Sequence, residues 1–287
     1  MSIKDSELIL NPDGSVYHLN LKPEDISDTI IFVGDQDRVE KITKHFDSIE
    51  FSTQKREFKT QTGYYQDRRI TVISTGIGPD NIDIVLNELD ALVNIDLKTR
   101  QPKTELTSLN IIRIGTSGSL QEDIPVDAFL LSTHGLDVNG MLHFYQIDGI
   151  SNPEIEDAFI KHTDWDNNKA RPIVINHSKY LEKYFESDMI FKGMTGTAGG
   201  FYGPQGRVLR LPLHDPDLNS KLDSFNYKDF RITNFEMETA GYYAMAKLMG
   251  HEILSVNAII ANRVKNKFSK TPNKVVDSLI KLVLDRI

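Results

Sequence analysis

Short apolar runs alternate along this chain with stretches whose apolar residues recur at helical spacing. The runs are rich in Ile and Val and end at Gly, Ser or Asn, which is typical of buried strands. They span residues 29–34, 70–78, 110–115, 128–132, 172–176 and 253–262. Helical spacing occupies residues 82–93, 240–248 and 275–283. Strands that alternate with helices predict a three-layer α/β/α sandwich, with helices on both faces of one central sheet.

The predicted helices have their own boundary signals. Pro79-Asp80 precedes the first helical pattern, Gly250 follows the second, and Thr271-Pro272 precedes the third. Proline is favoured at the first helical position and glycine just beyond the last. We therefore expect a helix that opens at Pro79, one that stops at Gly250, and one that is capped by the side chain of Thr271.

Two polar stretches interrupt the alternation of strands and helices. Residues 96–109 contain a proline and predict a surface insertion, and residues 212–229, with the sequence "HDPDLN", predict a second excursion from the fold. Strand-like runs continue on both sides of each stretch. We therefore predict a single domain over residues 1–287.

Composition narrows the class of protein. Hydrophobic residues make up 39% and charged residues 26% of the 287 residues, which is usual for a folded globular protein. The chain has no cysteine, so a disulfide framework and a thiolate nucleophile are excluded. A formal net charge of -8 argues against binding to nucleic acid or to an anionic membrane. With no signal-peptide pattern at the N-terminus, we expect a cytoplasmic protein.

The motifs of zinc proteases, serine hydrolases and P-loop nucleotide-binding proteins are missing from the sequence. It has no H-E-x-x-H, no G-x-S-x-G and no phosphate-binding P-loop motif, and its eight histidines lack the spacing of metal ligands. We therefore expect no metal site. Any anionic substrate must be held by arginines and backbone N–H groups.

Candidate chemistry lies where the predicted strands end. Gly34 and then Arg38 follow one strand at the start of a predicted helix, where free N–H groups suit an anion, although a tight turn with a solvated arginine is the alternative. Arg113 interrupts a buried run and needs a partner, either a structural carboxylate or a bound anion. Thr116 follows it in "GTSG". Together these residues suit phosphate.

Paired polar side chains mark two later stretches. Glu236 and Glu238 precede a helical pattern and suit the vicinal hydroxyls of a sugar, with surface solvation as an equal alternative. Glu238 is also explained as a first-turn carboxylate favoured by the helix dipole, whereas Glu236 is not. The loop "FYGPQGR" presents Gln205 and Arg207 two residues apart.

These stretches resemble the nucleoside phosphorylase-I family. The resemblance runs from about Tyr17 to Arg263 and rests on "KREF" (55–58), "STGIG" (74–78), "RIGTSG" (113–118) and "FEMETAG" (235–241). The Gln-x-Arg pattern after "FY" resembles the pattern of the uridine phosphorylase branch of this family. The resemblance implies a mixed central sheet, and a pentosyltransferase that cleaves uridine reversibly with phosphate to uracil and ribose 1-phosphate in pyrimidine salvage.

The resemblance also implies roles for individual residues. The phosphate ligands would be Gly34, Arg38, Arg56, Arg113 and Thr116. The ribose contacts would be His18, Thr116, Glu236, Met237 and Glu238. The base contacts would be Phe201, Gln205 and Arg207, and the catalytic groups would be Arg113, Gln205 and Arg207. His18 and Arg56 would serve a neighbouring subunit, which implies a homo-oligomer built from dimers with shared active sites.

The implied base contacts agree with the chemistry of uracil. One edge of uracil alternates carbonyl acceptors with an N–H donor, so an amide that donates and accepts, beside a guanidinium that only donates, matches it. Arg207 would also stabilise the negative charge that develops on the leaving base while phosphate attacks the anomeric carbon.

The sequence departs from the family pattern beside "STGIG". Asn81 stands where relatives have a serine. In some relatives, a position beside this one and the residue equivalent to Glu57 together help to hold a monovalent cation. We therefore expect no cofactor other than, at most, a potassium ion near Glu57.

Alternative functions remain open from the sequence. They are a purine nucleoside phosphorylase or a nucleoside hydrolase of the same fold, and a non-catalytic nucleoside-binding protein. The strand end at 257–263 offers Asn262 and Arg263 without the aspartate that a purine site generally uses. Three phosphate-facing arginines are hard to explain in a hydrolase, and a non-catalytic protein need not keep them.

Overall fold

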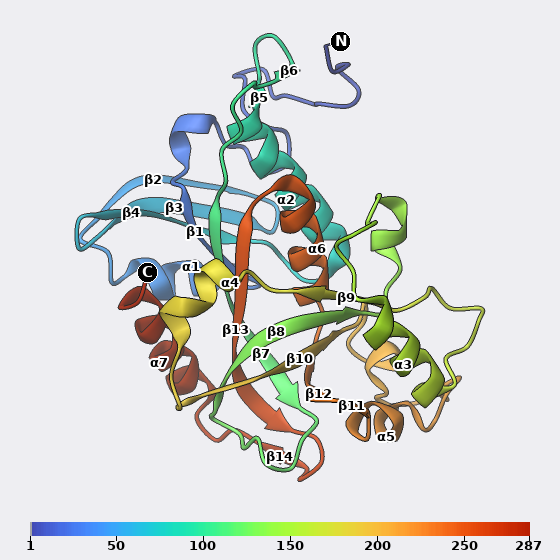
Figure 1. The fold of residues 1–287 in the computed structure, drawn as a ribbon. Helices are drawn as coiled ribbons and strands as arrows, with labels where there is room; N and C mark the ends of the chain where they lie inside the picture. The colour runs from blue at the N-terminus through green and yellow to red at the C-terminus, as the bar shows by residue number, and fades with distance from the viewer. Residues whose placement is uncertain (1) are drawn as a thin grey trace. The chain divides into compact units, whose positions relative to one another are not determined.

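A computed structural model describes residues 2–287. Figure 1 shows the chain as a ribbon. The chain divides into two compact units, each described below by itself. The first unit contains residues up to Arg113 together with Met249–Glu252, and the second contains Ile114–Leu248 with Ile253–Ile287. That the whole chain acts as one domain stays a prediction.

A mixed sheet forms the centre of the first unit. β1 (Thr29–Val33) pairs in parallel with β4 (Arg68–Ser74) and with Asn110–Arg113 of β7 (Asn110–Ser119). β3 (Phe58–Tyr65) pairs antiparallel with β4 and with β2 (Ser48–Lys55). β1 and most of β4 are buried because parallel strands are covered on both faces, whereas β2 alternates exposed and half-buried residues.

Two helices and a small hairpin complete the first unit. α1 (Gln36–Thr43) packs against β3 and β4. α2 (Pro79–Asn94) opens at the predicted proline and buries the predicted apolar face, including Ile82, Val85 and Leu89. The polar stretch after α2 forms β5 (Ile95–Asp96) and β6 (Gln101–Pro102), and residues 101–108 are exposed.

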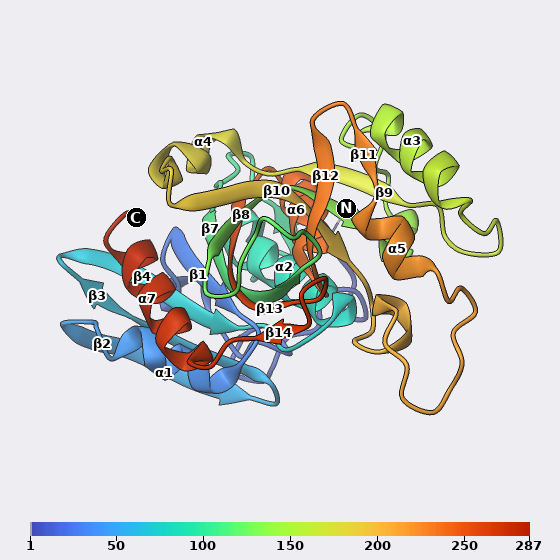
Figure 2. The ribbon, with the colours of Figure 1, turned by 90° about the horizontal axis from the view of Figure 1, so that it is seen from below.

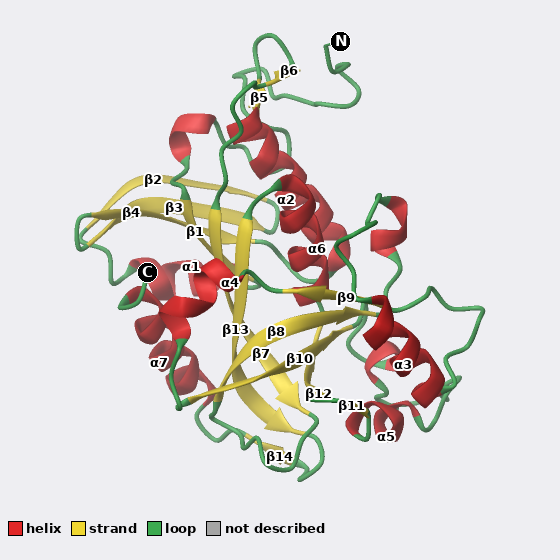
Figure 3. Cartoon of the chain, in the orientation of Figure 1, coloured by secondary structure: helices red, strands yellow, loops and turns green. Residues whose placement is uncertain are grey.

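A second mixed set of strands forms the centre of the second unit. β8 (Phe129–Asp137) pairs in parallel with β10 (Ile190–Thr197) and antiparallel with β9 (Ile173–Asn176) and β13 (Glu252–Asn262). β10 pairs in parallel with β12 (Phe230–Glu236), which pairs antiparallel with β11 (Asn226–Tyr227). β14 (Lys267–Phe268) pairs antiparallel with β13. Figure 3 shows these strands and the helices beside them.

The predicted strand 110–115 is longer than the sequence indicated. β7 continues through "GTSG" to Ser119, so Thr116 lies in a strand and not in a glycine loop. The physical reason is the antiparallel pairing of Gly118 and Ser119 with β12, which supplies backbone partners that a loop would lack.

Helices of the second unit pack on one another and on the strands. They are α3 (Pro153–Thr163), α4 (Lys179–Glu182), α5 (Leu218–Asp223), α6 (Thr239–Met249) and α7 (Pro272–Leu284). α3 contacts α5, β9 and β11, and Figure 2 shows α3 and α5 side by side. Gly250 follows α6 with a φ of +79°, as its predicted stop position requires. None of the helices within residues 2–287 is long and apolar enough to cross a membrane.

Two details of the helix predictions are wrong. The stretch 212–229 is not a plain excursion, because Leu218, Leu222 and Phe225 are buried in a hydrophobic cluster with Phe159. The side chain of Thr271 makes no capping hydrogen bond, because its backbone has ψ of 50° instead of the extended value of an N-cap. Pro272 nevertheless opens α7 as predicted. The predicted α/β fold with a mixed central sheet and flanking helices is confirmed.

Replacement of Gly135 on β8 should destabilise the second unit. A Cβ there would lie 2.5 Å from Cα of Ala240 at the start of α6, and backbone cannot move aside cheaply. We expect Gly135→Ala to lower the free energy of unfolding by about 1–3 kcal/mol, measured by urea denaturation. Gly203→Ala is the control, because no heavy atom of the described chain lies within 4 Å of its Cβ position. Equal stability of both variants would contradict this packing.

Candidate functional site

In the first unit, the ends of β1 and β4 lie close together. A Cβ on Gly34, which follows β1, would be 3.5 Å from the carbonyl oxygen of Gly76, which follows β4. α1 starts just after Gly34, and its N-cap Asp35 accepts a hydrogen bond from the N–H of Asp37 at 3.0 Å. Arg38 lies in the first turn of α1 and is half-buried. The predicted strand-to-helix turn therefore exists, with Arg38 at the helix start.

Arg56 lies at the tip of the β2–β3 hairpin. Its φ is +55°, in the left-handed region, and its side chain is exposed. The carbonyl oxygen of Arg56 accepts a hydrogen bond of 2.7 Å from Nε2 of Gln36, the first residue of α1. The backbone at the hairpin tip is thus tied to the start of α1. Arg38 and Arg56 are therefore brought to neighbouring elements of one unit.

Glu57 follows Arg56 and lies beside the end of β4. Its carbonyl oxygen accepts a hydrogen bond of 2.6 Å from Oγ of Ser74, and its Cγ lies 3.0 Å from where a Cβ on Gly76 would stand. Within residues 2–287, no group of three or more His, Asp or Glu side chains is arranged to hold a metal ion. A potassium ion near Glu57 stays a prediction.

His18 is held by a residue that the sequence did not single out. Glu88 on α2 accepts hydrogen bonds from the backbone N–H groups of His18 and Leu19, at 2.9 and 2.7 Å, and lies 2.6 Å from Nδ1 of His18. Because a carboxylate only accepts, Nδ1 of His18 is the donor in this contact, which fixes the orientation of the ring and leaves Nε2 directed away from Glu88. Nothing in the sequence marks Glu88, because it is one of several acidic residues on α2.

Arg113 is buried within β7, opposite Phe32 of β1. Only 5% of its surface is exposed, which confirms that the arginine interrupts a buried strand. A buried guanidinium is costly unless it is paired. Thr116, three residues further along β7, is half-buried.

In the second unit, Glu236 caps the start of α6. Its carboxylate accepts hydrogen bonds from the N–H groups of Glu238 and Thr239, each at 3.0 Å, and from the hydroxyl of Thr197 at 2.8 Å. The sequence interpretation was therefore wrong about which glutamate belongs to the helix: Glu236 is the carboxylate at the helix start. A cap depends on where the helix begins, and α6 begins only at Thr239.

Glu238 and Met237 lie between β12 and α6. Glu238 is 7% exposed, and Met237 is half-buried. The C-terminal ends of β10 and β12 are adjacent here, because Thr197 pairs with Glu236 in a parallel ladder. Carboxyl ends of parallel strands are where α/β folds bind ligands.

The loop 201–207 is internally fixed. Gln205 is 1% exposed and its Nε2 lies 3.4 Å from the carbonyl oxygen of Glu236. The guanidinium of Arg207 stacks over the ring of Phe201 at 3.9 Å and donates to the carbonyl oxygen of Phe201 at 2.6 Å. It also donates to Oε1 of Gln205. Arg207 therefore contacts both Phe201 and Gln205, and burial lowers the pKa of Arg207. That these three residues contact a base stays a prediction.

Arg263 joins this loop from the end of β13. Its Nη2 donates to the carbonyl oxygen of Gln205 at 2.6 Å, while its Nη1 is buried and has no hydrogen-bond partner in the described chain. Burial, and secondly the charge of Arg207, lowers the pKa of Arg263 to about 10. From the sequence, this strand end was considered only for the aspartate that a purine site generally uses, and that aspartate is missing from residues 257–263. An unpaired buried donor beside the loop 201–207 is a candidate contact for a ligand acceptor.

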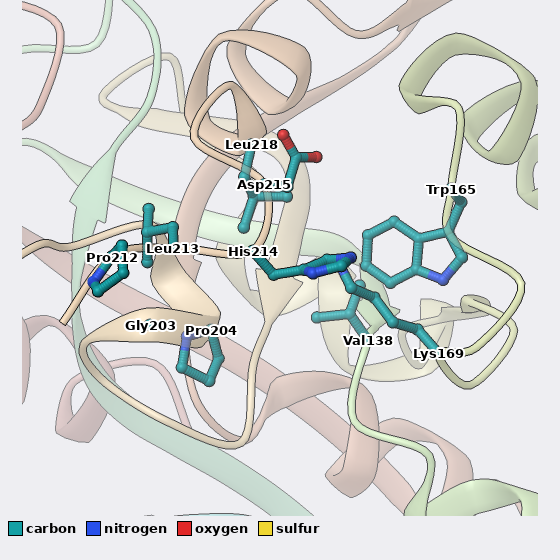
Figure 4. A pocket seen from close by; sticks show the side chains of 10 residues that line it. All are labelled: Val138, Trp165, Lys169, Gly203, Pro204, Pro212, Leu213, His214, Asp215 and Leu218. Atoms are coloured by element: carbon teal, nitrogen blue, oxygen red, sulfur yellow. The ribbon is translucent and has the colours of Figure 1, made fainter.

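A pocket of about 370 Å³ adjoins the same loop (Figure 4). Gly203 and Pro204 of the loop line one side, and Trp165 and Lys169 line the other. His214 lies between them and forms an ion pair of 2.8 Å with Asp166. The lining does not include Gln205 or Arg207.

This chain is similar in sequence and in structure to known nucleoside phosphorylases. A uridine phosphorylase of Thermococcus kodakarensis is 28% identical over 271 residues, covering 91% of this chain and 83% of the relative. A uridine phosphorylase of Treponema pallidum is 31% identical over 253 residues, covering 87% and 83%. A crystal structure of a Trypanosoma brucei nucleoside phosphorylase, described as showing uridine phosphorylase activity, superimposes with a TM-score of 0.87 at 28% identity, covering 97% and 98%.

The family model described as "Phosphorylase superfamily" matches residues 28–287, which is most of the chain. The match includes every predicted site residue except His18. Since the family model and these relatives agree with the motifs in the sequence, the chain belongs to the phosphorylase superfamily, as a member of its nucleoside phosphorylase-I family.

Proposed function

We propose that this protein catalyses the reversible phosphorolysis of uridine to uracil and ribose 1-phosphate. The observation that carries the proposal is the fixed set of Gln205, Arg207 and Arg263 in the second unit. The relatives named as uridine phosphorylases support the same substrate.

The base is recognised through its carbonyl and N–H groups. The amide of Gln205 donates and accepts, and the guanidinium of Arg207 only donates, so together they match one edge of uracil. Arg263 adds a third contact, because a carbonyl oxygen of the base gives its Nη1 the partner that the protein itself lacks. Two partly buried arginines also favour the base as its charge becomes negative.

Phosphate is the nucleophile of the reaction. Arg38, Arg56 and Arg113, with the N–H of Gly34, bind it, and the hydroxyl of Thr116 binds phosphate or ribose. A phosphate oxygen forms a bond to the anomeric carbon as the bond from that carbon to N1 of uracil breaks. The electron pair of the broken bond stays on the base, which then takes a proton to become uracil. Binding both reactants converts a bimolecular step into an effectively unimolecular one.

The sugar is held by groups of different character. Glu238 accepts hydrogen bonds from the ribose hydroxyls, with Met237 against the ring. Glu236 is already bonded to the start of α6, so it positions Glu238 more than it binds the sugar itself. Nε2 of His18 accepts from the ribose 5′-hydroxyl of a neighbouring subunit, in the ring orientation set by Glu88.

The proposed reaction recovers a free pyrimidine base and a sugar phosphate from a nucleoside. We propose that the protein serves pyrimidine salvage in the cytoplasm and needs no organic cofactor.

Release of base from uridine tests the proposed function. We expect the purified protein to release uracil from uridine only when inorganic phosphate is present, and to release little base from inosine. Chromatography of free base from both nucleosides, with and without phosphate, measures it. Release without phosphate would show a hydrolase, and release from inosine alone would show a purine enzyme; either result refutes the proposal.

Removal of the Arg263 guanidinium should damage base recognition selectively. Arg263→Met keeps an apolar stem, which packs near Gly118, but loses the donors. We expect kcat/KM for uridine to fall by roughly 100-fold, while KM for phosphate changes less than about twofold, in steady-state kinetics. Arg210→Met is the matched control, because Arg210 is exposed just beyond the loop. Equal kinetics of the two variants would remove Arg263 from the site.

Shared active sites require at least a dimer. If His18 and Arg56 serve a neighbouring subunit, the inactive variants His18→Ala and Gln205→Leu should regain activity when they are mixed and allowed to exchange subunits. A hybrid dimer then contains one site with both native residues. Light scattering gives the oligomeric state of the same samples. A fully active monomer, or no recovery in exchanged hybrids, would contradict shared sites.

A further inference from the structure

Two consecutive carbonyl groups of the loop 201–207 are bound by side chains from outside the loop. The carbonyl oxygen of Gln205 accepts from Arg263, as described above. The carbonyl oxygen of Gly206 accepts a hydrogen bond of 2.8 Å from Nδ2 of Asn219. Asn219 is the second residue of α5. Gly206, the residue between Gln205 and Arg207, is therefore held by a side chain of α5, in addition to the contact from Arg263 to Gln205.

α5 is a firm support for this contact. Leu218 and Leu222, on either side of Asn219, are buried in the cluster that contains Phe159 and Phe225. α5 also contacts α3 and β12. A side chain on an element packed in this way keeps its position better than one on a loop.

The backbone conformation of Gly206 and its lack of a side chain leave room for the amide of Asn219. Its φ is +65°, and a Cβ there would lie 2.6 Å from both Nδ2 and Oδ1 of Asn219. The asparagine amide thus occupies the space that a side chain at position 206 would need. The left-handed backbone turns the chain between Gln205 and Arg207, and the amide fixes that turn.

The amide of Asn219 is not explained by the fold alone. Its Oδ1 is buried and has no hydrogen-bond partner in the described chain. An unpaired buried acceptor is unfavourable, and asparagine is a poor helix former, so an apolar residue such as leucine would suit α5 better. The hydrogen bond from its Nδ2 to the carbonyl oxygen of Gly206 is the contact that favours asparagine here.

We propose that Asn219 is a positioning residue for base recognition: it holds Gly206 so that Gln205 and Arg207 keep the spacing that uracil requires. The inference rests on the proposed function. Asn219 does not touch the base; it acts through the loop. Its loss therefore affects the binding of uridine and leaves the binding of phosphate unchanged.

The structure supplies an independent reporter of the loop. Trp165 is the only tryptophan in the chain, and it lines the pocket whose opposite side is Gly203 and Pro204. A displaced loop changes the surroundings of the indole, and so changes its fluorescence emission without any substrate present.

The test uses two substitutions and one control. Asn219→Asp keeps the shape but replaces the donor by a carboxylate, and Asn219→Leu removes both the donor and the unpaired acceptor. Lys221→Gln is the control, because it breaks a bond of similar length from the same helix, 2.8 Å to Asp215, that does not hold Gly206. Steady-state kinetics, thermal unfolding and Trp165 emission are measured for all three in the full-length protein.

For both Asn219 variants we expect kcat/KM for uridine to fall about tenfold, with KM for phosphate changed less than about twofold. Asn219→Leu should unfold at a temperature no lower than the unsubstituted protein. Emission of Trp165 should shift in both Asn219 variants; Lys221→Gln is the control for the kinetics alone, because Lys221 and Asp215 line a pocket together with Trp165.

Three results would overturn the proposal. They are unchanged uridine kinetics in both Asn219 variants, a parallel loss of stability and activity in Asn219→Leu, and an equal kinetic effect in Lys221→Gln. If the unsubstituted protein fails to cleave uridine, the proposed function fails, and the emission shifts still decide whether Asn219 holds the loop.

Discussion

The carboxylate of Glu236 is the interaction on which the candidate site of the second unit depends. It joins three elements, because it accepts hydrogen bonds from the start of α6 and from Thr197 at the end of β10 while it ends β12 itself. The helix dipole and these donors offset the cost of burying its charge. The backbone carbonyl of the same residue faces the amide of Gln205. One buried residue therefore sets where Glu238 and the loop 201–207 lie relative to each other.

The arginines of this loop show how an acidic protein creates a local positive field. The chain carries a formal net charge of -8, yet Arg263 lies close enough to Arg207 for the charge of Arg207 to lower the pKa of Arg263. Like charges in a partly buried place are unfavourable until an anion arrives. In the proposed reaction, both guanidinium groups would attract a base that is acquiring negative charge. Such preorganised charge is what electrostatic catalysis requires.

How much the sequence reveals depends on the physical signal. The buried strands were found because Ile and Val gather in them, and α2 was found because its apolar face is continuous. The hairpin of β2 and β3 was missed because β2 has no buried residue and so has no apolar run. Gln205 and Arg207 could be predicted from a motif, but Arg263, Glu88 and Asn219 act through contacts between residues far apart in sequence. No local pattern records such contacts.

The division of the chain has a consequence for how base preference can change. Arg38, Arg56 and Arg113 all belong to the first unit, whereas the loop 201–207 and both side chains that hold its carbonyl groups belong to the second. Substitutions on α5 or at the end of β13 can therefore change the support of the loop without changing any of these three arginines. In evolutionary terms, if phosphate and base bind as proposed, the nucleophile and the leaving group are encoded by separable parts of the chain, so a lineage can explore new bases while it keeps the same chemistry.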